Sequence, residues 1–386
     1  MSRTCSMVVS LALLFCACEE KSDKQLTRET WADTFVLPSK ELDGWVDVDY
    51  RFGNTNPAYE KRSGPVVCID EWHFNRHAAA GIYRPFAEMI REDGYRVTRF
   101  RSLFTRQAIL DCEILVIANP QARGNMFGPG APDSNWAYPH TSALTAEEIS
   151  EVVLWIRSGG ALFLISDHAP LAAAVSDLGL LLGVNMLDGY TFASTEDMRE
   201  TQIGEIVFGT VKEEEWREAN RRLEDLVGWD FDVRSEPVFA APGTLAPHPV
   251  VEGRNAQEGI EWILTYTGQA FLVTDDWEPI MAFGPNAVSV VPWVFNLENA
   301  DYWDGPLFSA AGWLQGATRV LDQGRVALLG DGNMCSAGLG DMDGVLEEPL
   351  IPYGINDPRA PQNAQFCLNI VHWLSGLLDE PVTFEN

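Results

Sequence analysis

The sequence predicts an α/β fold built on a doubly wound, mainly parallel β-sheet with a β-rich insertion. Two observations support this prediction. Short apolar segments bounded by glycine, proline or polar residues alternate with amphipathic helical segments in the first half of the chain and again near its end. Three apolar segments, at 66–69, 161–165 and 326–329, lead directly into polar residues. An apolar run that is followed at once by polar residues is typical of a buried parallel strand and of the loop at its carboxyl end.

The elements of residues 41–185, the first part of the expected α/β domain, follow from local patterns. A helix over 82–93 has its apolar side chains on one face, and Gly94 ends it. Another helix begins at Thr145, with glutamates in its first turn in a near capping box. The expected order is strand 66–69, helix 82–93, strand 96–100, strand 114–118, a helix from 145 that ends at 159–160, strand 161–165 and helix 171–182.

Residues 186–300 lose most of the helical period and predict the β-rich insertion. We expect antiparallel strands at 204–211, 260–266, 270–273 and 287–295, and one helix at 213–226. The α/β pattern returns in residues 301–386, the last part of the domain. There we expect a helix within 304–322, a strand at 325–329 and an amphipathic helix over 362–378.

The amino-terminal residues predict export. Arg3 precedes an apolar stretch at 7–15, which is too short to span a bilayer and is typical of a secretory signal. The stretch ends in Phe15-Cys16-Ala17-Cys18, which is similar to a bacterial lipobox. We therefore interpret residues 1–18 as a lipoprotein signal peptide and Cys18 as the lipidated residue. Lipidation of Cys16 and plain secretion with cleavage near Ala17 are the alternatives.

The polar residues 19–40 are expected to form a tether between the lipid and the domain. The domain is then extracytoplasmic and attached to a bacterial membrane through the lipid anchor only. A formal charge of −29 argues against nucleic acid and anionic membrane surfaces as partners. The chain contains no CxxC pair, which argues against a thiolate zinc site. Cys68 and Cys112 fall in or beside predicted buried strands, where we expect them to act as small hydrophobic residues.

Several motifs occur in residues 64–185 and 320–378. They are Ile69-Asp70-Glu71-Trp72-His73-Phe74-Asn75, Tyr83-Arg84-Pro85-Phe86, Asp93-Gly94-Tyr95-Arg96-Val97, Leu115-Val116-Ile117-Ala118-Asn119-Pro120, Gly159-Gly160 with Ser166-Asp167-His168, and the helix over 362–377. Together they resemble uncharacterised bacterial proteins of the class I glutamine amidotransferase-like fold. That group is similar to the domain of gliding-motility auxiliary proteins and of an intraflagellar-transport subunit. The resemblance implies a fold but no definite activity.

The chain departs from true amidotransferases at their nucleophile. Those enzymes have a cysteine in a Gly-x-Cys-x-Gly turn after a central strand, whereas the matching turn here is Ser166-Asp167-His168-Ala169. Cys335 also follows a strand, but its neighbours lack the elbow pattern. A thiolate nucleophile and glutaminase activity are therefore not expected.

The polar ends of the predicted parallel strands are expected to meet in one pocket, because such strands expose their carboxyl ends at one edge of a sheet. Within this pocket we assign catalytic roles to Glu71, Asp167 and His168. The predicted ligand-binding residues are Asp70, His73, Asn75, His77, Asn119, Asp331 and Asn333.

A divalent metal is the cofactor that these side chains could hold, with His73, His77, Asp167 and His168 as candidate ligands. Glu71 would then act as general base for a metal-bound water. The structural alternative is that the same residues cap helices and bond backbone carbonyls, with Asp70 paired to Arg84.

Tryptophan is abundant, at thirteen residues, and several aromatic residues fall in predicted loops or in the insertion. These are Trp72, Trp136, Tyr138, Trp277, Trp293, Trp303 and Trp313, whereas Trp155, Trp262 and Trp373 fit a core. Flat rings beside acids and amides suit sugar stacking. The sequence therefore predicts a lipoprotein that binds a small molecule or glycan, with a cell-envelope saccharide as the suggested ligand. A metal-dependent hydrolase that uses the same pocket is the alternative.

Overall fold

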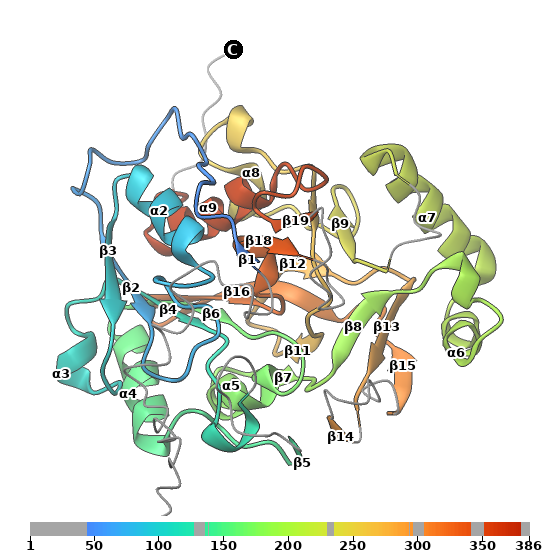
Figure 1. Ribbon diagram of the computed structural model, residues 1–386, viewed down its shortest axis with the longest axis horizontal. Helices are drawn as coiled ribbons and strands as arrows, with labels where there is room; N and C mark the ends of the chain where they lie inside the picture. Colours follow the sequence, from blue (N-terminus) through green and yellow to red (C-terminus); the bar gives the residue numbers. More distant parts are fainter. Residues whose placement is uncertain are drawn as a thin grey trace, which may run out of the picture.

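The computed structural model describes residues 45–126, 136–137, 139–229, 235–292, 294–295, 305–340 and 351–379 (Figure 1). The predicted signal peptide, the lipidated Cys18 and the tether lie outside these residues. In the described ranges no helix is both long and apolar enough to cross a membrane.

A nine-stranded sheet forms the centre of the fold and confirms the α/β prediction. Its order is β3-β2-β4-β6-β17-β16-β11-β7, with β12 also paired to β16. The first five strands in this order are mutually parallel, and the others run antiparallel to their neighbours. The bounds are β2 Val66–Asp70, β3 Arg96–Phe100, β4 Ile114–Ala118, β6 Ala161–Ile165, β7 Val184–Met186, β11 Phe271–Val273, β12 Glu278–Ala282, β16 Leu314–Leu321 and β17 Gly324–Leu329.

Helices cover both faces of the sheet, as a doubly wound fold requires. Helices α2, α8 and α9 lie on one side, and α4 and α5 lie on the other (Figure 1). Each parallel strand sends alternate side chains to the two sides, so Val116 packs toward α2 and α9 whereas Leu115 packs toward α4. The bounds are α2 Arg84–Glu92, α3 Arg106–Ile109, α4 Ala146–Arg157, α5 Leu171–Leu181, α8 Pro249–Glu252 and α9 Asn363–Leu374.

Smaller sheets and two further helices complete the described chain. Strands β8, β13 and β15 form a three-stranded sheet, and helices α6 and α7 lie beside it at one end of the molecule (Figure 1). Residues 186–300 thus contribute helices as well as strands, and β11 and β12 join the central sheet. The bounds are β1 Trp45–Val46, β5 Trp136–Ala137, β8 Tyr190–Ala193, α6 Gln202–Thr210, α7 Glu213–Val227, β9 Val238–Ala240, β10 Trp262–Leu264, β13 Ala287–Val290, β14 Val294–Phe295, β15 Leu307–Ser309, β18 Ala337–Gly340 and β19 Ile351–Gly354.

Two predicted elements are wrong. The strand expected at 204–211 is helix α6, because Val207, Ile203 and Phe208 pack on one side against the β8–β13 sheet. The helix expected within 304–322 is replaced by strands β15 and β16. Apolar residues at 314, 317 and 321 imitate a helical period. The first five residues of β16 are all buried, so the polar–apolar alternation that marks a half-exposed strand is lost.

The cysteines of the domain form two disulfides, which corrects the role expected for Cys68 and Cys112. Cys68 of β2 is bonded to Cys112, just before β4. Cys335, in a short 3-10 helix after β17, is bonded to Cys367 of α9. Both bonds link segments more than thirty residues apart and restrict the unfolded chain.

Candidate functional site

Six polar residues meet beyond the carboxyl ends of β2, β4, β6 and β17, and we call them the Asp167 cluster: His77, Asn119, Asp167, His168, Asp331 and Asn333. Oδ2 of Asp167 accepts hydrogen bonds from the backbone N–H of Gly332, at 3.0 Å, and from Nδ2 of Asn119, at 3.3 Å. Nδ1 of His77 lies 2.9 Å from Nδ2 of Asn119. Three sheet strands and the loop after β2 therefore contribute to one polar group, as the parallel topology predicts.

The Asn119 amide determines which ring nitrogen of His77 carries the proton. Its Oδ1 accepts a hydrogen bond from the backbone N–H of Asp167 at 2.8 Å, so its Nδ2 must be the atom that faces His77. Nδ1 of His77 then accepts, and the ring proton lies on Nε2, 3.3 Å from Oδ1 of Asn333. Burial lowers the pKa of His77 to about 4, which is consistent with a neutral ring.

Two buried carboxyl groups of this cluster, Asp167 and Asp331, interact electrostatically. Asp331 Oδ2 accepts from the backbone N–H of Tyr266 at 2.6 Å, and its Oδ1 accepts from that of Asn333 at 2.7 Å. Burial and the neighbouring charge of Asp167 nevertheless raise the pKa of Asp331 to about 8. A buried carboxyl group whose pKa is raised by burial and by a charged neighbour is typical of functional sites.

The cluster reaches the surface through two of its members. His168 is 22 % exposed and Asn333 is partly exposed, whereas the other four side chains are buried. The His168 ring stacks on Tyr190, with ring centroids 4.3 Å apart, and its Nδ1 lies 2.8 Å from the Ala169 carbonyl. The buried side chains of the cluster pack tightly around Gly332, since a Cβ atom at this glycine would lie 2.5 Å from Nδ2 of Asn119.

Unusual backbone conformations surround the cluster. Asn119, with φ of 46°, and Phe74, with φ of 52°, occupy the left-handed region. Thr267, with φ of 73°, precedes a glycine whose added Cβ would lie 3.0 Å from Cβ of Asp331. Such a φ is strained for a β-branched residue. Strained residues gather at functional sites in many proteins, which favours this cluster over other polar groups of the fold.

A second group, the His73 network, comprises Asp70, His73, Asn75 and Glu148 and is buried. Nδ1 of His73 lies 2.9 Å from Oδ2 of Asp70, and Nε2 lies 2.8 Å from Oε1 of Glu148. Nδ2 of Asn75 donates to the same Asp70 oxygen at 2.9 Å. The structural alternative fits this network, although Asp70 pairs with His73 rather than with Arg84. Sequence reasoning assigned Glu148 only to the capping box, which the structure confirms.

Glu71 lies on the far side of β2 from the Asp167 cluster. Its buried carboxylate accepts from Nε of Arg99, at 2.7 Å, and from Nε of Arg101, at 2.9 Å. The backbone N–H of Ala80 donates to its other oxygen. The structure therefore divides the predicted single pocket into the Asp167 cluster, the His73 network and the Glu71 ion pairs.

The predicted metal ligands do not form a metal site as placed. Both ring nitrogens of His73 bond carboxylates, and both ring nitrogens of His77 bond amides. Neither ring retains a lone pair for a cation. Over the described ranges, no three or more His, Cys, Asp or Glu side chains are grouped as a metal would require.

The aromatic residues predicted for sugar stacking are dispersed. Trp277 is buried and donates from Nε1 to the Leu182 carbonyl at 2.8 Å, so it belongs to the core. Trp313 packs against the main core and is partly buried. Tyr138, Trp293 and Trp303, and the side chain of Trp136, lie outside the described part of the chain. The structure instead places Tyr190 and Tyr83 at the Asp167 cluster, where Tyr190 stacks on His168 and the Tyr83 ring lies 4.7 Å from that of His77. The sequence pattern predicted neither ring for stacking.

No protein-family model and no curated protein matches this chain. Solved structures similar to it include the N-terminal domain of mmIFT52, with 10 % identity, a TM-score of 0.46, and coverage of 80 % of this chain and 97 % of that one. A cytoplasmic protein from Salmonella typhimurium has 12 % identity, a TM-score of 0.42, and coverage of 80 % and 98 %. A ThuA-like protein from Bacteroides uniformis has 8 % identity, a TM-score of 0.39, and coverage of 83 % and 95 %.

Proposed function

We propose that this chain is a lipid-anchored, extracytoplasmic bacterial protein that binds a small polyhydroxyl ligand, of the cell-envelope saccharide class, at the Asp167 cluster. The domain that binds it is of the amidotransferase-like type and has no glutaminase chemistry. The observation that supports the site most directly is the position of His168 and Asn333. Both are partly exposed, above a buried carboxyl pair at the edge where α/β sheets bind ligands.

The side chains of this cluster suit hydroxyl groups. Carboxylate and amide oxygens accept hydrogen bonds, amide and imidazole N–H groups donate them, and a sugar hydroxyl does both. The bonds of Asn119 to His77 and Asp167 hold these groups in place before a ligand arrives. A site that is organised in advance loses less entropy when it binds.

The two disulfides support the proposed compartment. Disulfides form and persist in secreted and periplasmic proteins and are rare in the cytosol. Cys68–Cys112 and Cys335–Cys367 therefore agree with the export signal of the sequence. They also engage every cysteine of the described domain, Cys335 included, so none of these four sulfurs supplies a free thiolate.

The proposal is tested by titrating the purified domain with soluble cell-envelope saccharide fragments in a calorimeter. His168→Ala and Asn333→Ala should each weaken binding by about tenfold, the loss expected for one good polar contact. Asn185→Ala is the matched control, because Asn185 is exposed on β7, and it should bind as the wild type does. Equal affinity in all four proteins, with unchanged circular dichroism, would contradict the assignment of the site.

A further inference from the structure

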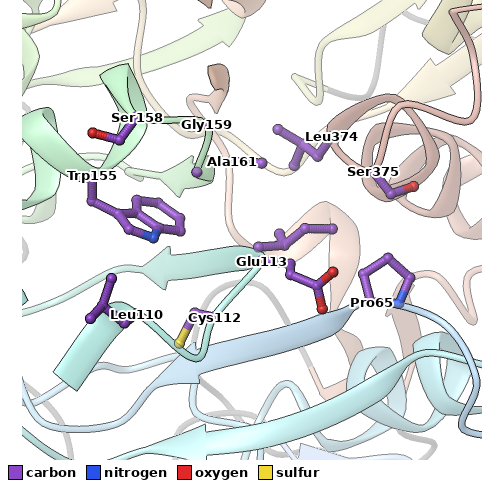
Figure 2. A pocket seen from close by; sticks show the side chains of 12 residues that line it. Pro65, Leu110, Cys112, Glu113, Trp155, Ser158, Gly159, Ala161, Leu374 and Ser375 are labelled. Carbon is purple, nitrogen blue, oxygen red and sulfur yellow. The ribbon is translucent and has the colours of Figure 1, made fainter. Parts of the chain in front are cut away.

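A separate cavity of about 390 Å³ opens at the opposite edge of the sheet, where β4 and β6 begin (Figure 2). Ile114 and Ala161 start these strands and form part of its floor, whereas Asn119 and Asp167 follow the other ends of the same strands. Five residues of strand separate the two regions by roughly 16 Å. The volume lies within the range of ordinary small-molecule sites, so this cavity needs its own explanation.

The walls of the cavity combine an aromatic ring with apolar side chains. Figure 2 shows Trp155 on one side and Leu374 with Ser375 on the other, with Glu113 between them. Trp155 is 8 % exposed, and its ring lies close against Gly160, which also lines the cavity. A Cβ atom at Gly160 would lie 2.3 Å from Cδ2 of this ring, so the glycine is required for the ring to occupy its position.

The charge within the cavity is negative. The Glu113 side chain is 58 % exposed, and its Oε2 accepts from the backbone N–H of Val66, at 2.8 Å, and from Nη2 of Arg96, at 3.2 Å. Among the described residues no donor bonds its Oε1. Arg96 therefore offsets part of the charge from one side and leaves the second oxygen available to a ligand.

One helix end adds to this negative potential. Ser158, which lines the cavity, is the C-cap residue of α4, a helix of twelve residues. The carboxyl end of a helix has a partial negative charge of roughly one-half and favours cations. The carboxyl end of α9 is offset by Arg325, whose Nη1 donates to the Trp373 carbonyl at 2.9 Å. A carboxylate, the carboxyl end of α4 and an indole ring are together the groups that attract a positive charge on an apolar body.

We propose that this cavity binds a small soluble organic cation, such as an alkylammonium or quaternary ammonium compound. Glu113 is its counter-ion and Trp155 is the aromatic wall. Anionic ligands are disfavoured because Glu113 would repel them. Neutral ligands gain nothing from the charge of Glu113 or from the carboxyl end of α4.

The experiment compares choline with dimethylbutanol, its neutral carbon isostere, by calorimetry on the wild-type domain. The indole N–H resonance of Trp155, identified by its loss in Trp155→Phe, reports whether binding occurs in this cavity. Choline should bind saturably and shift this resonance, and the isostere should bind at least about tenfold more weakly. Equal binding of the two compounds overturns the proposal, and so does the absence of saturable choline binding.

Two substitutions that each remove one negative charge sharpen the test. Glu113→Gln keeps the side-chain shape and an oxygen for Val66 and Arg96, and it should weaken choline binding about tenfold. Asp111→Asn removes the same charge from an exposed neighbour that does not line the cavity, and it should change the affinity less than about twofold. If both variants lose affinity equally, the effect is one of overall charge and the assigned counter-ion is wrong.

Discussion

Nε2 of His73 lies 2.8 Å from Oε1 of Glu148, so a buried contact connects the loop after β2 to the first turn of α4 across 75 positions of sequence. The other ring nitrogen contacts Asp70 at 2.9 Å. Burial opposes a charge on this imidazole, but the two carboxylates outweigh it and raise the pKa of His73 to about 9. At neutral pH the ring is therefore a buried cation between two anionic partners, and its energetics can be tested.

Replacement of one partner should be costly. Glu148→Gln retains the capping box, because glutamine serves at that position too, but it removes a charge from the buried ion pair. We expect the free energy of unfolding to fall by about 3 kcal/mol, measured by urea denaturation at pH 7. Glu147→Gln is the matched control on the exposed side of the same turn. It should change the free energy of unfolding by less than about 0.5 kcal/mol. Similar losses in both variants would show that the His73 contact contributes little.

The same contact predicts a pH dependence above neutrality. Because the pKa of His73 rises from 6.5 in the unfolded chain to about 9 in the folded one, its contribution is full below 6.5 and is lost as pH rises through about 9. The stability difference between wild type and His73→Gln should therefore shrink over this range. A difference that stays constant would contradict a charged imidazole.

Asn119→Asp should change the protonation of His77. Aspartate tolerates the positive φ of this position, so the backbone is expected to remain in place. The amide donor to Nδ1 is lost and a second carboxylate joins Asp167, and both changes favour a protonated ring. The pKa of His77, measured by NMR titration, should rise from about 4 to above 6.5. An unchanged value would show that burial alone sets it.

Asp331 should make the protein less stable as pH rises. Its pKa is raised from 3.8 to about 8, so this contribution to stability is full below 3.8 and disappears as pH rises through about 8. One bound proton corresponds to a slope of up to about 1.4 kcal/mol per pH unit in this interval. Asp331→Asn should remove that slope from urea denaturation curves measured between these pH values. A slope that persists in the variant would assign it to other groups.

Lipidation is tested by cell fractionation. Cys18→Ala should release the protein from the membrane fraction, because the apolar stretch at 7–15 is too short to remain as an anchor by itself. Cys16→Ala is the matched control and should leave the protein in the membrane fraction. The reverse pattern would identify Cys16 as the lipidated residue, and release in neither variant would argue against a lipid anchor.

Local patterns predicted the parallel half of the sheet and its helices. The capping box at Thr145 and Glu148 and the apolar runs at 114–118 and 161–165 are complete within a few residues, so they are visible in the sequence. Strand β16 was mistaken for a helix because the burial of its first five residues hides the alternation of a strand. That burial depends in part on β12, whose residues pair with those of β16 across more than thirty positions of sequence. A local window contains no information about such a partner.

The candidate site was predictable only in part, for the same reason. The topology rule brought Asn119, Asp167 and Asp331 together, since each directly follows a parallel strand. It could not separate His73 from this cluster, because the bond that does so comes from Glu148 on a helix face. The positive φ of Thr267 depends on the packing of the folded chain and has no signature in the residue type.

The disulfide between Cys335 and Cys367 has a consequence for the timing of maturation. It attaches to α9 the short segment that begins with Asn333, two residues after Asp331. In a reducing cytoplasm a newly synthesised chain lacks this bond. If the protein is exported as proposed, the disulfide that links the segment of Asn333 to α9 forms only after the chain leaves the cytoplasm. The ligand site would then be completed last, and copies retained in the cytoplasm are expected to be inert.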